Sequence, residues 1–351
     1  MSEENIQLKS YKYDIEIKEI ENHESNGLDA SWLTLNMSGK DFNIKIANSL
    51  RRASANNVPT YAIPQELISI DTNTAVAFNN DYMRLRLSQL PVYGVDSELY
   101  FLADKYWNKD KINYADTKRD RHPKEKNIEY YLNVHNNKAS IVPITTNDLK
   151  IYIDGEETKV YNPKYPILLI KLRPNDRFKC HMKACLGIGD RNVIWSASRN
   201  GYYHEPENNK KPNEIEFTIE GNGQCHEYEI LIRSCKYLIK KYTDLKNDLE
   251  NKIETKQIIH EKEIHLDLNK EDYTIGEPLN YEFQSHKNII KSGLIRPDHL
   301  VKAMMIKVES ISGVESPLNA MLECLTTLIE KYSHIGKILN DMKNNIKKIK
   351  I

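Results

Sequence analysis

The chain has 351 residues, and its 50 basic and 50 acidic side chains give a formal net charge of zero at pH 7. This balance argues against a protein that coats nucleic acid, whose surface is usually strongly basic, and the length allows two or three domains with hydrophobic cores. Five irregularly spaced cysteines, an N-terminus without a signal pattern and no run near 18 apolar residues indicate an intracellular protein without a membrane span.

The first predicted elements are two strands, at residues 13–20 and 32–37, where apolar and polar residues alternate. A short amphipathic helix follows, with Asp41 as the expected N-cap and Pro59 beyond its end. Its apolar face is formed by residues at helical spacing, namely Phe42, Ile46, Leu50 and Ala53. A helix of this size cannot form a core alone, so this face needs a partner.

The middle of the chain differs in composition. Residues 105–140 are polar and contain a mixed charge run at 118–126, which we interpret as a loop-rich insertion with a solvated loop. A helix is predicted over residues 81–90, and Asp154-Gly155 is typical of a hairpin turn. Strands are predicted at residues 67–70, 141–153, 165–185 and from Ile215 onward.

The C-terminal part repeats the order of the N-terminal part. A helix of about seven turns begins near Cys225, with an apolar residue at every third or fourth position. The elements predicted after it are a strand at 263–268, a helix over 275–287 capped by Thr274, a strand at 304–310 and a long helix capped by Ser316. Strand, short helix, strand and long helix therefore occur twice, which predicts two similar units.

The fold class predicted is α+β. It consists of two dimerisation modules, each a small sheet with helices, paired within one chain, and a mostly β insert domain interrupts the first. The first module is expected at residues 1–94 and 211–254, the insert at 95–210 and the second module at 255–351. The residues expected at the internal dimer interface are Phe42, Ile46, Leu50, Ala53, Ile232, Leu238, Leu279, Phe283, Leu322, Leu325 and Ile329.

Several segments resemble the alpha-type assembly subunits of multisubunit RNA polymerases, a family that includes the bacterial alpha subunit, the archaeal D-type protein and the third-largest subunit of polymerase II. The similar segments are IANSLRR (46–52) before NVPT (57–60), RLRLSQLPV (84–92), LLIKLRPNDRFKC (168–180) and GIGDRNVIWS (187–196). Residues 271–276 (EDYTIG) through 316–322 (SPLNAML) resemble the small partner of that family, the archaeal L-type protein or the eleventh subunit of polymerase II. Fusion of the two partners is a feature of some large DNA viruses.

This resemblance implies a non-catalytic scaffold for a DNA-directed RNA polymerase. The implied partners are the second-largest subunit, then the largest, and a small subunit of the tenth- or twelfth-subunit type. A viral origin would place the protein in the virion and in the host cytoplasm, at viral factories, or in the nucleus. The residues implied to contact other subunits are Asn48, Arg51, Arg52, Arg86, Arg173, Gly187, Gly189 and Trp195.

The chain also departs from the family pattern. It lacks the clustered cysteines that hold zinc or an iron–sulfur cluster in the insert domain of several relatives. Asn192 stands where the family often has histidine, and Glu277-Pro278 replaces the usual Asn-Leu. These positions concern particular contacts rather than the fold.

The pattern of cysteines, histidines, glycines and possible nucleophiles predicts no catalytic, metal or cofactor site. Cys180 and His181 are adjacent on a predicted strand, so they point to opposite faces and cannot both bind one ion. Glycine pairs at 187/189 and 221/223 lack the context of a phosphate loop and are interpreted as turns. No nucleophile has a base beside it in a recognisable motif.

Two interpretations remain open from the residues. The long helices could instead form a homodimeric coiled coil in a stand-alone interaction or nucleic-acid-binding protein, which would bind through residues 118–126 and the C-terminal lysines. Direct contact with DNA is otherwise expected to be minor or absent. Arg51 and Arg52 could simply face solvent with their stems on the core edge. If they contact a subunit, alanine at both positions should weaken binding and leave thermal stability nearly unchanged.

Overall fold

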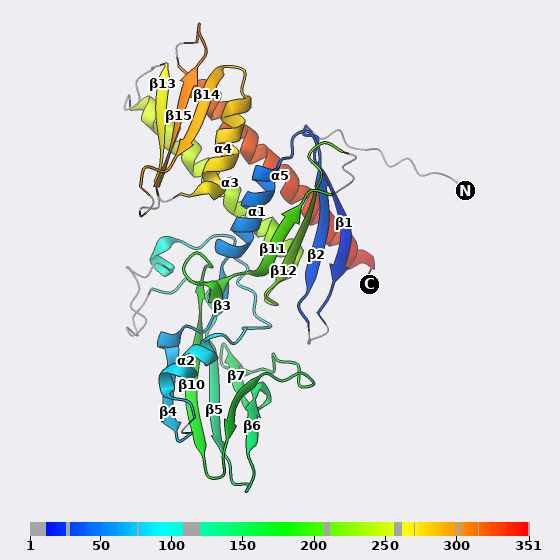
Figure 1. Cartoon of the computed structure of the whole chain (residues 1–351), viewed down its shortest axis with the longest axis vertical. Coiled ribbons are helices and arrows are strands. Elements are labelled where there is room, and N and C mark those ends of the chain that lie inside the picture. The colour runs from blue at the N-terminus through cyan, green and yellow to red at the C-terminus, as the bar shows by residue number, and fades with distance from the viewer. Residues whose placement is uncertain are drawn as a thin grey trace, which may run out of the picture.

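The computed structural model has three connected units, two in which helices cover a sheet and one formed mostly of strands (Figure 1). The residues it describes are 12–25, 29–75, 77–107, 120–206, 211–255, 262–269, 271–298, 300, 303–314 and 316–349, the last four without their side chains. The mixed architecture confirms the predicted α+β class. Among the described residues, no helix has the length and hydropathy to cross a membrane.

The first unit is a four-stranded antiparallel sheet with helices α1 (Ile44–Asn56) and α3 (Glu227–Glu254). Its strands, in spatial order, are β1 (Glu16–His23), β2 (Trp32–Ser38), β12 (Ile215–Gly221) and β11 (Ser198–His204). The predicted N-cap Asp41 is wrong. Asn43 caps α1, because its Oδ1 accepts hydrogen bonds from the N–H groups of Lys45 and Ile46 at 2.9 and 3.0 Å, while Asp41 accepts one from the Asp14 N–H.

The second unit repeats this arrangement. Its elements are β13 (Glu263–Asn269), α4 (Tyr273–Ser285), β14 (Ile289–Ile295), β15 (Ala303–Ser310) and α5 (Leu318–Ile349). The strand order β13-β15-β14 matches β2-β12-β11, and β1 is an additional edge strand of the first sheet. The predicted cap Thr274 is wrong as well, since Asp272 caps α4 by accepting the Thr274 N–H at 2.8 Å. Strand β14 was not predicted.

The two units pair through their helices. Helices α3 and α5 lie side by side, and α1 faces α4 (Figure 1). The rings of Tyr242 on α3 and Tyr332 on α5 stack with centroids 5.8 Å apart, and both are fully buried. One hydrophobic cluster therefore runs through both units. It contains nine of the eleven residues predicted at the internal interface, and the partly buried Leu322 and Ile329 pack against it.

The insert unit lies below the two paired units in the view of Figure 1. Its largest sheet has the order β3-β10-β5-β7-β8, with β4 also paired to β10, and β6 pairs with β9. The strands are β3 (Thr60–Ala62), β4 (Ile68–Asn73), β5 (Ile128–His135), β6 (Val142–Thr145), β7 (Lys150–Ile153), β8 (Glu156–Glu157), β9 (Leu168–Leu172) and β10 (Arg177–Gly187). Helix α2 (Asn80–Ser88) covers β4, and short 3-10 turns lie at Gln65–Leu67, Asp104–Tyr106, Thr146–Asp148 and Val193–Trp195.

The structure corrects part of the secondary structure expected in the insert. Residues 128–135 form a strand rather than part of a loop, and the strands expected at 141–153 and 165–185 are each broken in two. The hairpin at Asp154-Gly155 is confirmed, since both residues have positive φ and join β7 to β8. The insert's hydrophobic core extends from Tyr61 to Ile188, so its packing includes residues 61–92 that were assigned to the first module.

Candidate functional site

The polar residues beside the apolar face of α1, Asn48, Arg51 and Arg52, make contacts in two directions. Asn48 Oδ1 accepts hydrogen bonds from Arg51 Nε and Nη2 at 3.2 and 3.1 Å, and the Arg51 stem lies against Gly201 on β11. Both side chains are half-buried. Asn48 and Arg51 therefore form a polar pair on the outer side of α1, beside the edge strand of the first sheet.

Arg52 points the other way, toward the second unit. Its Nη2 donates to Asp272 Oδ2 at 2.7 Å, and its Nε donates to Thr274 Oγ1 at 2.8 Å. Next to it, the buried Ser49 hydroxyl donates to the Thr274 carbonyl at 2.6 Å. Arg52 was predicted to contact another subunit; in the structure its guanidinium joins α1 to the start of α4 within the chain.

Arg52→Ala should lower the free energy of unfolding by about 1–2 kcal/mol, because a hydrogen-bonded ion pair with half-buried partners is lost. Urea denaturation at pH 7 measures this change. Arg51→Ala is the matched control and should cost less than about 0.5 kcal/mol, because Arg51 bonds only to its own helix. Equal effects of the two substitutions would contradict the assignment.

The Arg52→Ala effect should depend on pH. Burial opposes ionisation of Asp272, but the hydrogen bonds from Thr274 and the charge of Arg52 together hold its pKa below the ordinary value of 3.8. A carboxylate with a lowered pKa stabilises the fold above its unfolded-state pKa, and this contribution is lost as the pH falls through the native pKa. The difference between wild type and Arg52→Ala should therefore be complete near pH 7 and shrink below pH 3.8.

The predicted contacts at residues 187–195 join the insert to α1. Trp195 is 1% exposed, and its Nε1 donates to the Cys185 carbonyl at 3.0 Å. A Cβ at Gly187 would lie 2.7 Å from the Trp195 ring, and one at Gly189 would collide with the Ala55 carbonyl at the end of α1. These close approaches explain the two glycines and the tryptophan by packing inside the chain.

The last two predicted contacts lie on the insert. Arg86 donates to the carbonyls of Leu168 and Leu169 at 2.9 and 2.8 Å, which fastens α2 to β9. Arg173 lies in the turn between β9 and β10, and its side chain is exposed. Of the eight residues predicted to contact other subunits, Arg173 and the Asn48–Arg51 pair present polar groups to the outside.

Cys180 and His181 lie on opposite faces of β10. The thiol faces the core, where burial raises its pKa to about 12. The imidazole stacks on Tyr131 with ring centroids 4.4 Å apart. In the described part of the chain, no three histidine, cysteine or acidic side chains are grouped as metal ligands would be.

A charged network that the sequence did not indicate ties the insert to both long helices. Arg233 on α3 is 6% exposed at its side chain and donates two hydrogen bonds to Asp96, at 2.6 and 2.7 Å. Its Nε also donates to Glu229 at 3.0 Å, and Lys343 on α5 pairs with the same carboxylate. Burial opposes ionisation of Asp96, but the hydrogen bonds from Arg233 and from the Glu98 N–H, together with the charge of Arg233, lower the pKa of Asp96.

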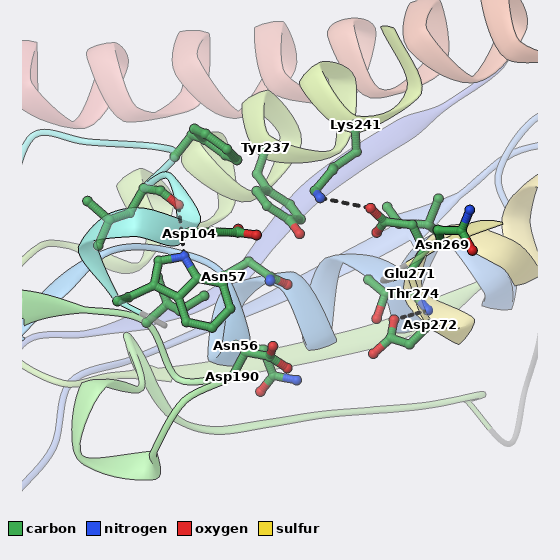
Figure 2. A pocket seen from close by; sticks show the side chains of 15 residues that line it. Asn56, Asn57, Asp104, Asp190, Tyr237, Lys241, Asn269, Glu271, Asp272 and Thr274 are labelled. Carbon is green, nitrogen blue, oxygen red and sulfur yellow. Dashed lines mark hydrogen bonds and ion pairs between the residues drawn. The ribbon is translucent and has the colours of Figure 1, made fainter. Parts of the chain in front are cut away.

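A cavity of about 300 Å³ lies where the three units meet. Figure 2 shows its walls, which come from the end of α1, the turn at Asp104–Tyr106, residues 188–190, helix α3 and the connection from β13 to α4. No pattern in the sequence pointed to it, because its residues come from five segments that only the fold brings together. Its lining is strongly polar and rich in carboxylates.

The comparisons with known proteins agree with this architecture. The family model of the RNA polymerase Rpb3/Rpb11 dimerisation domain matches residues 37–242, from β2 to α3. The chain is 26% identical over 354 aligned positions to a protein described as a DNA directed RNA polymerase subunit of Acanthamoeba polyphaga mimivirus, covering 93% of this chain and 94% of that protein. It is 25% identical over 179 positions to subunit 3B of DNA-directed RNA polymerases IV and V of Arabidopsis thaliana, covering 48% of this chain and 52% of that protein. Because the family model spans more than half of the sequence, this chain belongs to the RNA polymerase Rpb3/Rpb11 dimerisation domain family.

Proposed function

We propose that the chain is a non-catalytic assembly scaffold of a DNA-directed RNA polymerase, in which both dimerisation partners are fused. Membership of the family gives it an alpha-type subunit role in transcription. In this proposal the paired units form an intramolecular pseudo-heterodimer that binds the second-largest subunit and then the largest. The reaction itself belongs to those large subunits.

The observation that carries the proposal is the doubled architecture. The strand orders β2-β12-β11 and β13-β15-β14 match, and each unit places a short helix before a long one. The apolar faces of these helices are buried against each other in one hydrophobic cluster. A second copy of the chain is therefore not needed to cover them, which disfavours the alternative of a homodimeric coiled coil.

The outer surfaces are then available for other subunits. We propose that the Asn48–Arg51 pair faces one large subunit and that the exposed Arg173 on the insert serves a further contact, to a small subunit of the tenth- or twelfth-subunit type. The mimivirus relative supports an origin in a large DNA virus, with the protein in virions and at sites of viral transcription in the host cell. The lysines at 347, 348 and 350, considered for nucleic acid binding, lie outside the described side chains.

Co-expression with the second-largest polymerase subunit of the same genome tests the scaffold. We expect a stable complex on size-exclusion chromatography with light scattering, which the largest subunit then joins. The double variant Asn48→Ala/Arg51→Ala should weaken this complex by about tenfold without a change in the unfolding midpoint, because the pair bonds only within α1. Absence of a complex between two folded proteins would refute the proposal.

The matched control for that variant is Glu156→Ala/Glu157→Ala. These two exposed residues form β8, the short strand that pairs with β7 at the end of the insert sheet. The control should bind like the wild type. If the control and the α1 variant weaken binding equally, the loss reflects general surface charge rather than a contact at α1.

A further inference from the structure

The sheets of the two paired units differ at one edge. Strand β13 corresponds to β2, because each precedes the short helix of its unit and occupies the matching place in the strand order. In the first unit β1 covers the outer edge of β2 through seven residue pairs. In the second unit β13 is itself the last strand of the sheet (Figure 1). Among the described strands, none fills beside β13 the position that β1 fills beside β2.

The pairing of β13 with β15 determines which backbone groups face this open edge. The carbonyl of Lys262, just before β13, accepts a hydrogen bond from the Ser310 N–H at 2.9 Å. Opposite residues of an antiparallel pair alternate between hydrogen-bonded and non-hydrogen-bonded pairs. The register of β13 on β15 is unbroken, so its even-numbered residues bond to β15. The N–H and C=O groups that point to the open edge therefore belong to Glu263, His265, Asp267 and Asn269.

The other three edges of these two sheets are interrupted, and the edge of β13 is not. A bare edge is a template for another chain, so proteins usually break it with a bulge or cover it. The pairing of β1, of β11 and of β14 each contains an irregularity in register. Helix α4 also packs on β14, where Gln284 Nε2 donates to the Ser292 carbonyl at 2.9 Å. Strand β13 instead has the unbroken pairing of an interior strand and contains neither proline nor lysine.

The side chains of β13 define what an added strand needs. Ile264 and Leu266 are buried on one face of β13, and His265 and Asp267 are exposed on the other. An added strand continues both faces, so apolar residues are needed beside the buried pair. Among the described residues, Asp267 takes part in no ion pair. Because opposite charges on neighbouring strands attract, a lysine or arginine suits the position beside Asp267.

We propose that the edge of β13 binds an extended segment of a partner polymerase subunit, which adds a fourth strand to the three-stranded second sheet. The segment that fits has alternating apolar and basic residues. Backbone hydrogen bonds supply its affinity, and the alternate side chains supply its selectivity. The inference rests on the proposed scaffold function and adds the place and the chemistry of one contact.

Hydrogen–deuterium exchange of the full chain, free and in complex with the co-expressed second-largest and largest subunits, tests the edge directly. The amides of His265 and Asp267 should exchange rapidly in the free chain and at least about tenfold more slowly in the complex. Rapid exchange in both states would overturn the proposal. Slow exchange in the free chain would also overturn it. Light scattering then tells whether a second copy or another segment of the same chain covers the edge.

His265→Pro tests the backbone contact. Proline removes an N–H that points away from β15, so no hydrogen bond within the sheet is lost, and proline is tolerated on edge strands. Affinity for the large subunits, measured by surface plasmon resonance, should fall by about tenfold. The matched control His265→Ala keeps the N–H and should bind like the wild type. Equal losses in the two variants would assign the effect to the side chain and overturn strand addition.

Asp267→Lys tests the charge and decides the matter if the proline variant does not fold. Affinity should fall by about three- to tenfold, because two like charges would then face each other across the added strand. The matched control Glu156→Lys makes the same reversal at an exposed position on β8 and should keep wild-type affinity.

Failure of the scaffold itself has a different result. If the wild-type complex forms while Asp267→Lys binds like its control, strand addition is wrong and the scaffold function stands. If the wild-type chain forms no complex with either large subunit, the proposed function fails, and strand addition fails with it.

Discussion

Lys331→Met should lower the free energy of unfolding by about 3–5 kcal/mol, the cost of leaving one member of a buried ion pair alone. Lys331 on α5 lies 2.6 Å from Glu282 on α4, and the two side chains are 8% and 10% exposed. Methionine fills the volume of the lysine stem but provides no partner for the carboxylate. Chemical denaturation at pH 7, followed by circular dichroism, measures the loss.

The double variant Glu282→Leu/Lys331→Met should recover most of that loss. With both charges removed, nothing polar is left buried, and such replacements are often neutral or stabilising. Lys252→Met is a matched control on α3, where the exposed pair with Asp248 should contribute less than about 1 kcal/mol. If the double variant is as unstable as Lys331→Met, the loss comes from disturbed packing of α4 against α5.

This pair also illustrates what the sequence could not show. Glu282 and Lys331 are two among 100 formally charged residues, and their separation of 49 positions has no local signature. The network of Asp96, Arg233 and Lys343 and the acidic cavity depend in the same way on the meeting of distant segments. Periodicity reports which face of an element is apolar, but not which charge on a neighbouring element it will meet.

What the sequence predicted well was local. The long helices and their apolar stripes, the doubled order of elements and the hairpin at Asp154-Gly155 follow from spacing and turn chemistry alone. Helix α5 nevertheless buries a wider face than predicted. Met321, Cys324 and Leu328 are also buried, because the helix packs both against α3 and within its own unit.

The errors have physical causes. The predicted caps Asp41 and Thr274 each lie two residues from the side chain that caps the helix, Asn43 for α1 and Asp272 for α4. A pattern in the sequence places the end of a helix only to within one or two residues. Strand β14 was missed because it is an edge strand with alternate residues exposed and Lys291, Ser292 and Gly293 at its centre. Gly187 and Gly189 were recognised by resemblance, but only the structure relates them to Trp195 and to the end of α1.

Cutting the chain between its two units should leave them paired. A protease site inserted between Thr255 and Lys262 allows the cut after folding, and the two pieces should elute together on size-exclusion chromatography at micromolar concentration. The physical reason is that one hydrophobic cluster crosses the junction and the buried rings of Tyr242 and Tyr332 stack within it. Loss of the connection removes only the effective concentration that it supplied.

Leu325→Asp should separate the pieces after the same cut. Leu325 on α5 has no exposed surface, so a carboxylate there would be buried without a partner at a cost of several kcal/mol. Leu300→Asp is the matched control in the same unit, since Leu300 is 81% exposed, and its pieces should remain together. Free separation of the unmutated pieces would refute the pseudo-heterodimer.

The two pieces should also stay associated after the cut because the contacts between the two units are not confined to the long helices. Tyr13, before β1, donates to Glu330 on α5, and Tyr242 on α3 donates to the Ile275 carbonyl of α4 at 3.1 Å. Weakening one such contact after the cut, for example with Tyr13→Phe, should raise the dissociation constant of the pieces by less than about tenfold. Leu325→Asp should raise it far more, because it disrupts the hydrophobic cluster that all these contacts border.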